Sequence, residues 1–254
     1  MRIQNQNESA LRDHVFATYI SLRYGMVALG IAFPFLLWLG GKLLYSIDLQ
    51  PSMSHYYFAP YPESASVTAF PMRGLFVGML FAIGTGLFLY RGFTNWENIA
   101  LNLAGVFAVL VALIPMGIDG KTGGGVTLHG TCAVLLFCCL AFVAVFCADA
   151  TVAYLPPDPL LRARFRRRYK QLGIMMLLLP SVAYVLTMVT DHGSRLVFLA
   201  EALGVWCFAA YWWVKSSEMK ASNAERLALD GKIRPPKRRR DRLFPTFSVE
   251  QSAE

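Results

Sequence analysis

Side chains that could do acid–base or metal chemistry lie between the apolar runs of this chain or near their ends. His55, His129 and His192 lie before or at the start of such a run, and Glu201 lies inside one, five residues after Leu196. An ionised carboxylate at the middle of a bilayer costs roughly 2.5–3.5 kcal/mol, and less near the surface. We therefore expect Glu201 to have a partner or to carry a proton.

Two kinds of chemistry fit these residues. Imidazole and carboxylate groups could hold Zn²⁺ and activate a water molecule. The sequence has no HxxxH, HExxH or CxxC pattern, so zinc ligands would have to come from separate elements. The candidate metal ligands are His55, His129 and His192, and the candidate catalytic groups are His55, Asp119, His129 and Glu201. A serine beside His55 could instead supply a nucleophile or position a lipid headgroup.

A structural role is the alternative for the same residues. Polar side chains gather at the ends of membrane-spanning helices because water is there, and Glu201 would then pair with Arg73 or His129 from another helix. If the residues instead form a ligand pocket, the side chains expected to line it are Ser52, Ser54, His55, Tyr56, Tyr57, Arg73, Asp191 and His192. The sequence leaves both alternatives open.

The composition indicates the class of protein. Of 254 residues, 56% are hydrophobic and 16% are charged, whereas about 25% of a soluble domain is charged. The net charge of +8 comes from basic residues that stand in blocks beside apolar runs, which favours contact with a membrane surface over contact with nucleic acid. The five cysteines all lie inside apolar runs, so we expect free thiols.

The apolar runs predict an all-α bundle of six membrane-spanning helices in one domain, residues 24–215. The expected spans are 24–45, 72–90, 99–118, 129–148, 172–190 and 196–214. Residues 1–23 are expected to form an N-terminal segment at the membrane surface, residues 46–71 a long loop, and residues 216–254 a basic, largely flexible tail.

The distribution of basic residues predicts the orientation in the membrane. With six spans, 20 of the 24 Lys and Arg residues lie on the side that carries both termini. Cytoplasmic segments are enriched in Lys and Arg, so both termini are expected in the cytoplasm and the three histidines on the outside. We expect a multi-pass protein of a bacterial inner membrane, with membrane lipids, a membrane protein or a second copy of the chain as partners and no nucleic acid.

Two further patterns concern helix packing. Gly74 and Gly78 have the GxxxG spacing that lets a second helix approach closely. Tyr211, Trp212 and Trp213 follow one another near the end of the last span, which is typical of an aromatic belt at the membrane surface.

Several motifs carry a resemblance to known proteins. These are SMSHYY (52–57), MRGLFVGMLFAIG (72–84), YRG (90–92), NLAG (102–105) and EALGVWCFAAYWWVK (201–215). The chain resembles a group of small bacterial six-span membrane proteins of unassigned function, and the resemblance covers nearly all six spans in order. It implies the six-span fold and transfers no catalytic residues.

A more distant similarity is to the membrane-embedded metal hydrolases that include alkaline ceramidases and progestin-type receptors. Members of that superfamily pair a Ser and a His about four residues apart with an Asp and a later HxxxH. Here Ser52 and Ser54 stand three residues and one residue before His55, and the HxxxH is missing.

Three functions are consistent with these patterns. The first is a non-enzymatic membrane protein whose outward-facing polar pocket binds a lipid or a partner protein. The second is a membrane-embedded lipid hydrolase, with or without a metal. The third is a small proton-coupled transporter in which Glu201 passes protons. The sequence does not decide whether the chain is an enzyme.

Overall fold

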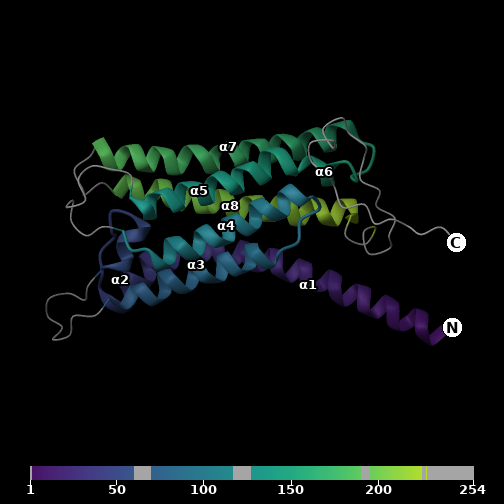
Figure 1. The fold of residues 1–254 in the computed structure, drawn as a ribbon, viewed down its shortest axis with the longest axis horizontal. Coiled ribbons are helices and arrows are strands. Elements are labelled where there is room, and N and C mark those ends of the chain that lie inside the picture. Colours follow the sequence, from purple (N-terminus) through teal and green to yellow (C-terminus); the bar gives the residue numbers. More distant parts are fainter. Residues whose placement is uncertain (1, 60–69, 117–126, 190–194, 225–226, 228–254) are drawn as a thin grey trace.

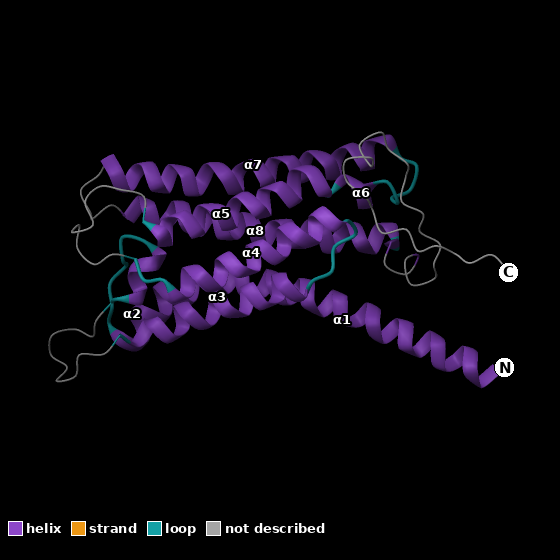
Figure 2. Ribbon diagram, viewed as in Figure 1, coloured by secondary structure: helices purple, strands orange, loops and turns teal. Residues whose placement is uncertain are grey.

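The computed structural model describes residues 2–59, 70–116, 127–189, 195–224 and 227. All regular secondary structure in these ranges is helical (Figure 2). The helices are α1 (Arg2–Phe35), α2 (Gly41–Tyr45), α3 (Pro71–Leu89), α4 (Asn95–Leu113), α5 (Leu128–Phe142), α6 (Asp149–Val152), α7 (Pro159–Val189) and α8 (Arg195–Ser222). A π-helix, Leu36–Gly40, joins α1 to α2, and a second, Val143–Cys147, follows α5 just before α6.

The long helices lie side by side along the bundle (Figure 1). Each helix contacts the next in the order α1, α3, α4, α5, α7, α8. Helix α8 also contacts α1, so the six helices form a closed ring. The start of α1 and the end of α8 lie at one end of the bundle, which we call the terminal end. The opposite end carries the segment 46–59 and the starts of α3, α5 and α8, and we call it the loop end.

Local signals in the sequence explain where several helices begin and end. Thr94 and Thr127 are N-caps, whose hydroxyl groups accept hydrogen bonds from the backbone N–H groups of Glu97 and Gly130 at 3.1 Å each. Helix α4 ends at Leu113, two residues before Pro115, because the residue that precedes a proline avoids helical geometry. The predicted span 99–118, which contained Pro115, is therefore too long at this end.

Helix α7 begins well before the predicted span 172–190. Its first turns include the basic block between Arg162 and Lys170, which precedes the predicted span. At 1.5 Å per residue its 31 residues extend about 46 Å, more than the roughly 30 Å hydrocarbon core of a bilayer. Helix α7 is therefore longer than a single crossing needs, and its basic turns lie at the terminal end.

The ends of the chain also differ from the predicted segments. Helix α1 runs without interruption from Arg2, through the predicted surface segment 1–23, into the first span, and its first half projects from the bundle (Figure 1). Helix α8 continues to Ser222, past the predicted end of the last span.

Five helical segments of the described chain are long and apolar enough to cross a membrane. They are Asp13–Tyr45, Pro71–Leu89, Asn95–Leu113, Leu128–Val152 and Arg195–Ser222. The predicted span 172–190 lies in α7, which is not among these five segments. Several side chains near the C-terminal end of α7 lie outside the described part of the chain. A sixth crossing therefore stays a prediction. The fold is that of a multi-pass helical membrane protein.

Glycines bring α3 and α4 together, but not at the predicted positions. A Cβ added at Gly105 would lie 2.6 Å from the carbonyl oxygen of Gly84, so the two backbones touch there. A Cβ at Gly74 or Gly78 would meet nothing within 4 Å. The close approach predicted from the Gly74–Gly78 spacing is therefore wrong, and the Gly84–Gly105 pair takes that role.

The predicted aromatic belt at the end of the last span is largely buried. Tyr211 and Trp212 are 2% and 0% exposed, and the ring of Trp212 lies 4.7 Å from that of Tyr90. Of the three aromatic residues, only Trp213 is exposed, at 57%. Tyr211 and Trp212 therefore belong to the core of the bundle.

Candidate functional site

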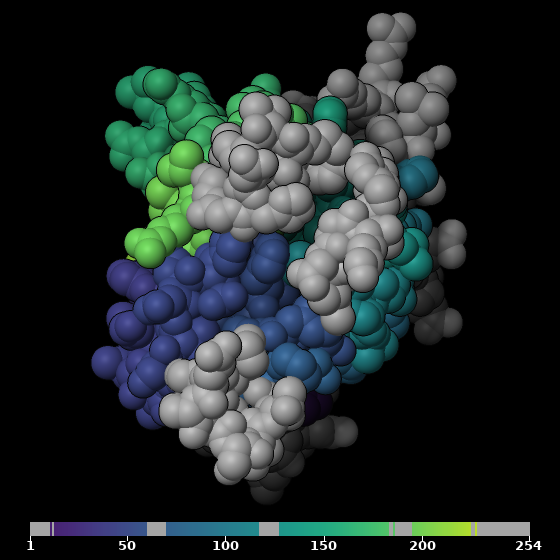
Figure 3. Space-filling model, turned by 90° about the vertical axis from the view of Figure 1, so that its left-hand side faces the viewer, coloured from purple at the N-terminus to yellow at the C-terminus, as the bar shows by residue number. Residues whose placement is uncertain are grey.

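The segment 46–59 crosses the loop end of the bundle, as the dark blue atoms in Figure 3 show. Its central part is a short 3-10 helix, Met53–Tyr57. Ser52 is the N-cap of this helix, and its hydroxyl group accepts a hydrogen bond from the backbone N–H of His55 at 3.3 Å. The cap fixes the direction in which the following side chains leave the backbone.

Three consecutive residues of this segment, 52–54, each make a hydrogen-bond contact with one of the predicted site residues His55, Glu201 and His129. Ser52 Oγ lies 2.6 Å from His55 Nδ1. The backbone N–H of Met53 donates to Glu201 Oε2 at 2.6 Å. Ser54 Oγ lies 3.0 Å from His129 Nε2. Two of the three histidines that the sequence placed at this end, His55 and His129, and the carboxylate of Glu201 thus contact residues 52–54.

Glu201 binds the backbone of the loop instead of the side chains we expected. The expected partners were Arg73 and His129, but the contact that the structure gives is the Met53 N–H. Phe198, one helical turn before Glu201, adds a backbone bond from its N–H to the carbonyl of Pro51 at 2.9 Å. The first turns of α8 therefore hold the loop at two neighbouring points.

His129 connects three elements. Its Nδ1 lies 2.7 Å from the backbone carbonyl of Ile114, the C-cap residue that follows α4, and its Nε2 faces Ser54. The residue is the second in α5 and is only 7% exposed. The imidazole thus ties the segment 46–59 to the ends of α4 and α5.

Arg73 holds the other end of the 3-10 helix. Its Nε donates to the carbonyl of Tyr57 at 3.1 Å, and its guanidinium lies 4.5 Å from the centre of the Tyr57 ring and 4.4 Å from that of Phe70. Tyr56 is fully buried, with its ring 6.1 Å from that of Phe198, and burial raises its pKa. Both tyrosines therefore anchor the loop.

The remaining predicted site residues, Asp119, Asp191 and His192, lie outside the described residues. Within the described part of the chain, no three His, Cys, Asp or Glu side chains come close enough together to hold a metal ion. A zinc site that includes His192 stays a prediction.

An apolar groove opens between α1 and α8 near the loop end. It has a volume of about 300 Å³, and its walls include Phe35, Trp38, Leu199 and Trp206, with Arg195 among the lining residues. The groove lies where Pro34 and the π-helix Leu36–Gly40 interrupt regular α-helix geometry. Pro34 lies inside the predicted span 24–45, and no pattern in the sequence pointed to a groove there.

An ion pair lies next to one wall of the groove at the loop end. Lys42 Nζ lies 2.7 Å from Asp48 Oδ1 on the surface, and this hydrogen bond lowers the pKa of Asp48. Arg195 lowers it further through its charge, so it lies within electrostatic reach of the pair. Leu49, the residue after Asp48, forms part of the groove wall.

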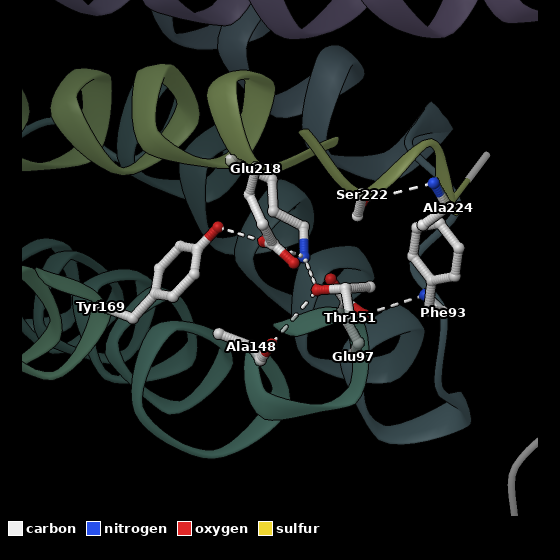
Figure 4. A network of polar contacts seen from close by, with 9 residues as sticks. Phe93, Glu97, Ala148, Thr151, Tyr169, Glu218, Ser222 and Ala224 are labelled. Atoms are coloured by element: carbon white, nitrogen blue, oxygen red, sulfur yellow. Dashed lines mark hydrogen bonds and ion pairs between the residues drawn. The ribbon is translucent and has the colours of Figure 1, made fainter. Parts of the chain in front are cut away.

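A second polar network is buried at the terminal end (Figure 4). Lys215 Nζ donates to Thr151 Oγ1 at 2.6 Å and lies 3.5 Å from Glu218 Oε2, which also accepts a hydrogen bond from Tyr169. Glu97, nearby in the same network, accepts from the backbone N–H of Phe93 at 2.8 Å. Three fully buried charged side chains therefore lie together, and the sequence analysis had assigned none of them to a site.

No protein-family model, curated protein or solved structure matches this chain. The class of protein therefore follows from its own helices, which are those of a multi-pass membrane protein.

Proposed function

We propose that this protein binds a phospholipid, with one acyl chain in the groove between α1 and α8 and the anionic headgroup at Arg195. The observation that carries the proposal is an apolar groove in the membrane-spanning region with Arg195 among its lining residues. The groove surface is almost wholly apolar, so Arg195 lines it with its aliphatic stem, and the proposal places the charge at the mouth of the groove. A phospholipid has the same pattern, because an apolar chain continues into a charged phosphate.

The size and lining of the groove favour a single chain. Ligand pockets range from about 300 to 1,000 Å³, so a groove of about 300 Å³ is at the lower end of this range. Phe35 and Trp206, whose ring centres lie 5.1 Å apart, form a rigid apolar wall. Such a surface offers an acyl chain dispersion contacts and no polar group to desolvate.

The charge at the loop end favours a phosphate. Arg195 is the first residue of the 28-residue helix α8, and the N–H groups at a helix N-terminus attract anions. A guanidinium binds phosphate through two parallel hydrogen bonds. The exposed Leu196 and Leu199 follow Arg195 into the membrane, so headgroup and chain would bind in sequence along one helix.

The polar cluster of segment 46–59 supports the groove. Leu49 forms part of the wall, and the chain two to four residues later is tied to α8 through Pro51 and Met53. In this proposal Glu201 shapes a lipid site without contacting the lipid. The orientation with both termini in the cytoplasm of a bacterial inner membrane puts Arg195 in the outer leaflet.

Native mass spectrometry of the protein released from detergent micelles tests the proposal. The probe is phosphatidylglycerol, compared with a neutral diacylglycerol of the same chains. Arg195→Gln is expected to weaken phosphatidylglycerol binding about tenfold, the loss of one charge-assisted contact. Leu199→Trp, which fills the groove, is expected to abolish binding.

Arg167→Gln is the matched control because it removes the same charge from an exposed position at the terminal end. Equal lipid binding by Arg195→Gln, Arg167→Gln and the wild-type protein would contradict the proposal. Equal binding of the diacylglycerol and the phosphatidylglycerol would contradict the part assigned to Arg195.

A further inference from the structure

We infer that Ser54 and His129 form a nucleophile and general-base pair that cleaves a carboxylic ester of an acyl chain. This site lies on the segment 46–59 and the start of α5, and it does not depend on the groove between α1 and α8. The inference rests on the geometry of two hydrogen bonds made by one imidazole.

The two bonds of His129 define its tautomer. A backbone carbonyl can only accept a hydrogen bond, so the 2.7 Å contact with Ile114 requires the proton on Nδ1 when the imidazole is neutral. Nε2 then carries a lone pair, and the Ser54 hydroxyl donates to it at 3.0 Å. This is the arrangement of a nucleophile, a base and a group that orients the base, with a carbonyl in the orienting position.

The neighbouring Ser52–His55 pair is formed within a single turn of the chain. His55 follows Ser52 by three residues, and Ser52 Oγ accepts the backbone N–H of His55 as an N-cap, in addition to its contact with the ring. That pair is local and stabilises the start of the 3-10 helix. Ser52→Ala therefore removes the cap of this turn but neither partner of the Ser54–His129 contact.

Both sides of Ser54 are held in place. The preceding residue, Met53, is bound by Glu201 through its N–H, and Tyr57, three residues later, is bound by Arg73 through its carbonyl. Glu201 and Arg73 are thus positioning residues. A reacting group held from both sides keeps its geometry when a substrate arrives.

The depth of the pair fits an ester of a membrane lipid. Ile114 is the C-cap of α4 and His129 is the second residue of α5, so the pair lies where these two helices reach their ends. The ester groups of phospholipids lie at the same level, between the acyl chains and the headgroups. The N-terminus of α5 is also close, and its partial positive charge favours the oxyanion that forms during acyl transfer.

The reaction balances with water as the co-reactant. Ser54 Oγ attacks the carbonyl carbon of the ester while its proton passes to His129 Nε2. The carbon–oxygen bond to the leaving group then breaks, and the alcohol leaves with that proton. Water attacks the acyl group on Ser54 and gives a proton to His129 Nε2, which returns it to Ser54 Oγ as the carboxylic acid leaves.

A fluorophosphonate probe on the purified protein in detergent tests this inference. Its phosphorus bonds to an activated serine oxygen and fluoride leaves, so peptide mass spectrometry identifies the labelled residue. We expect labelling at Ser54, with the rate reduced about 100-fold or more in His129→Ala, because a general base contributes roughly 10²–10⁴-fold. In Ser52→Ala the labelled residue is expected to remain Ser54, at a reduced rate because the N-cap that orders this turn is lost.

Absence of labelling at Ser54 in folded wild-type protein would overturn the inference, whatever the variants do. Labelling of Ser54 at an equal rate in His129→Ala would overturn the role of the histidine. Lipid binding in the groove is measured separately, and Ser54→Ala is expected to retain it, so failure of one site is distinguishable from failure of the other.

Discussion

Replacing Lys215 by Met is the strongest test of the buried network at the terminal end. The side chains of Lys215 and Glu218 are 0% exposed, and so is Glu97. Removing one partner of a buried ion pair costs about 3–5 kcal/mol because an uncompensated charge is left behind. Met retains the apolar length of the lysine stem, so the loss reports the charge and its bond to Thr151 more than the packing.

The corresponding shift in melting temperature is large enough to measure. At 2–4 °C per kcal/mol for a chain of this size, a loss of 3–5 kcal/mol lowers the melting temperature by roughly 6–20 °C. Tryptophan fluorescence in mild detergent follows the transition because Trp212 is fully buried.

A double-mutant cycle distinguishes the ion pair from a general packing defect. Glu218→Gln removes the carboxylate charge while retaining an oxygen that can accept the Tyr169 hydroxyl. Lys215→Met leaves the buried carboxylates of Glu97 and Glu218 without a cation. In Lys215→Met/Glu218→Gln only the Glu97 carboxylate is left, so the loss of stability in the double variant is expected to be smaller than the sum of the two single losses, by about 0.5–3 kcal/mol. A loss below about 1 kcal/mol in Lys215→Met, or strict additivity in the cycle, would refute the reasoning.

Two further changes have expected outcomes in the same unfolding assay. Glu201→Leu leaves the Met53 N–H without its acceptor and should lower the free energy of unfolding by about 1–3 kcal/mol. Glu201→Gln keeps an acceptor oxygen and should lower it less. Equal losses in the two variants would contradict the role of the acceptor oxygen. Gly105→Ala should lower the free energy of unfolding by about 1–3 kcal/mol because its Cβ would press on the Gly84 carbonyl. The control Gly78→Ala faces open space and should cause no measurable loss. A larger loss in Gly78→Ala than in Gly105→Ala would contradict the close approach of α3 and α4.

The membrane class could be predicted because it depends on composition and run length, which are properties of single segments. The helical segments overlap the predicted spans for the same reason. The boundaries differ where a capping residue or a proline acts locally, as at Thr94 and Pro115, or where a helix continues through polar residues, as α7 does through its basic block.

Partners across the bundle could not be predicted. The sequence placed the histidines and Glu201 at one end, but Ser54 and His129 are 75 residues apart, and no spacing rule joins them. Glu201 binds a backbone N–H, which every residue except proline has, so no residue type in the sequence points to Met53.

The burial of Lys215 and Glu218 could not be predicted from the sequence either. Lys215 and Glu218 stand near a run of basic and polar residues and look like the solvated end of a helix. They are buried because α8 extends past the expected end of the span and packs against α6 and α7 there. Helix length, which the apolar run does not define, decides the environment of both residues.

The most direct test of the lipid site is photocrosslinking with a phosphatidylglycerol that carries a diazirine on its acyl chain, in vesicles, followed by peptide mapping. The proposal predicts adducts concentrated on the groove, at Trp38, Leu199 and Trp206. Phe88 and Phe146, which are 55% and 61% exposed and are not among the groove's lining residues, report the background from bulk lipid. Adducts at the groove several-fold above this background would support the lipid site, and an even distribution over all exposed apolar residues would contradict it.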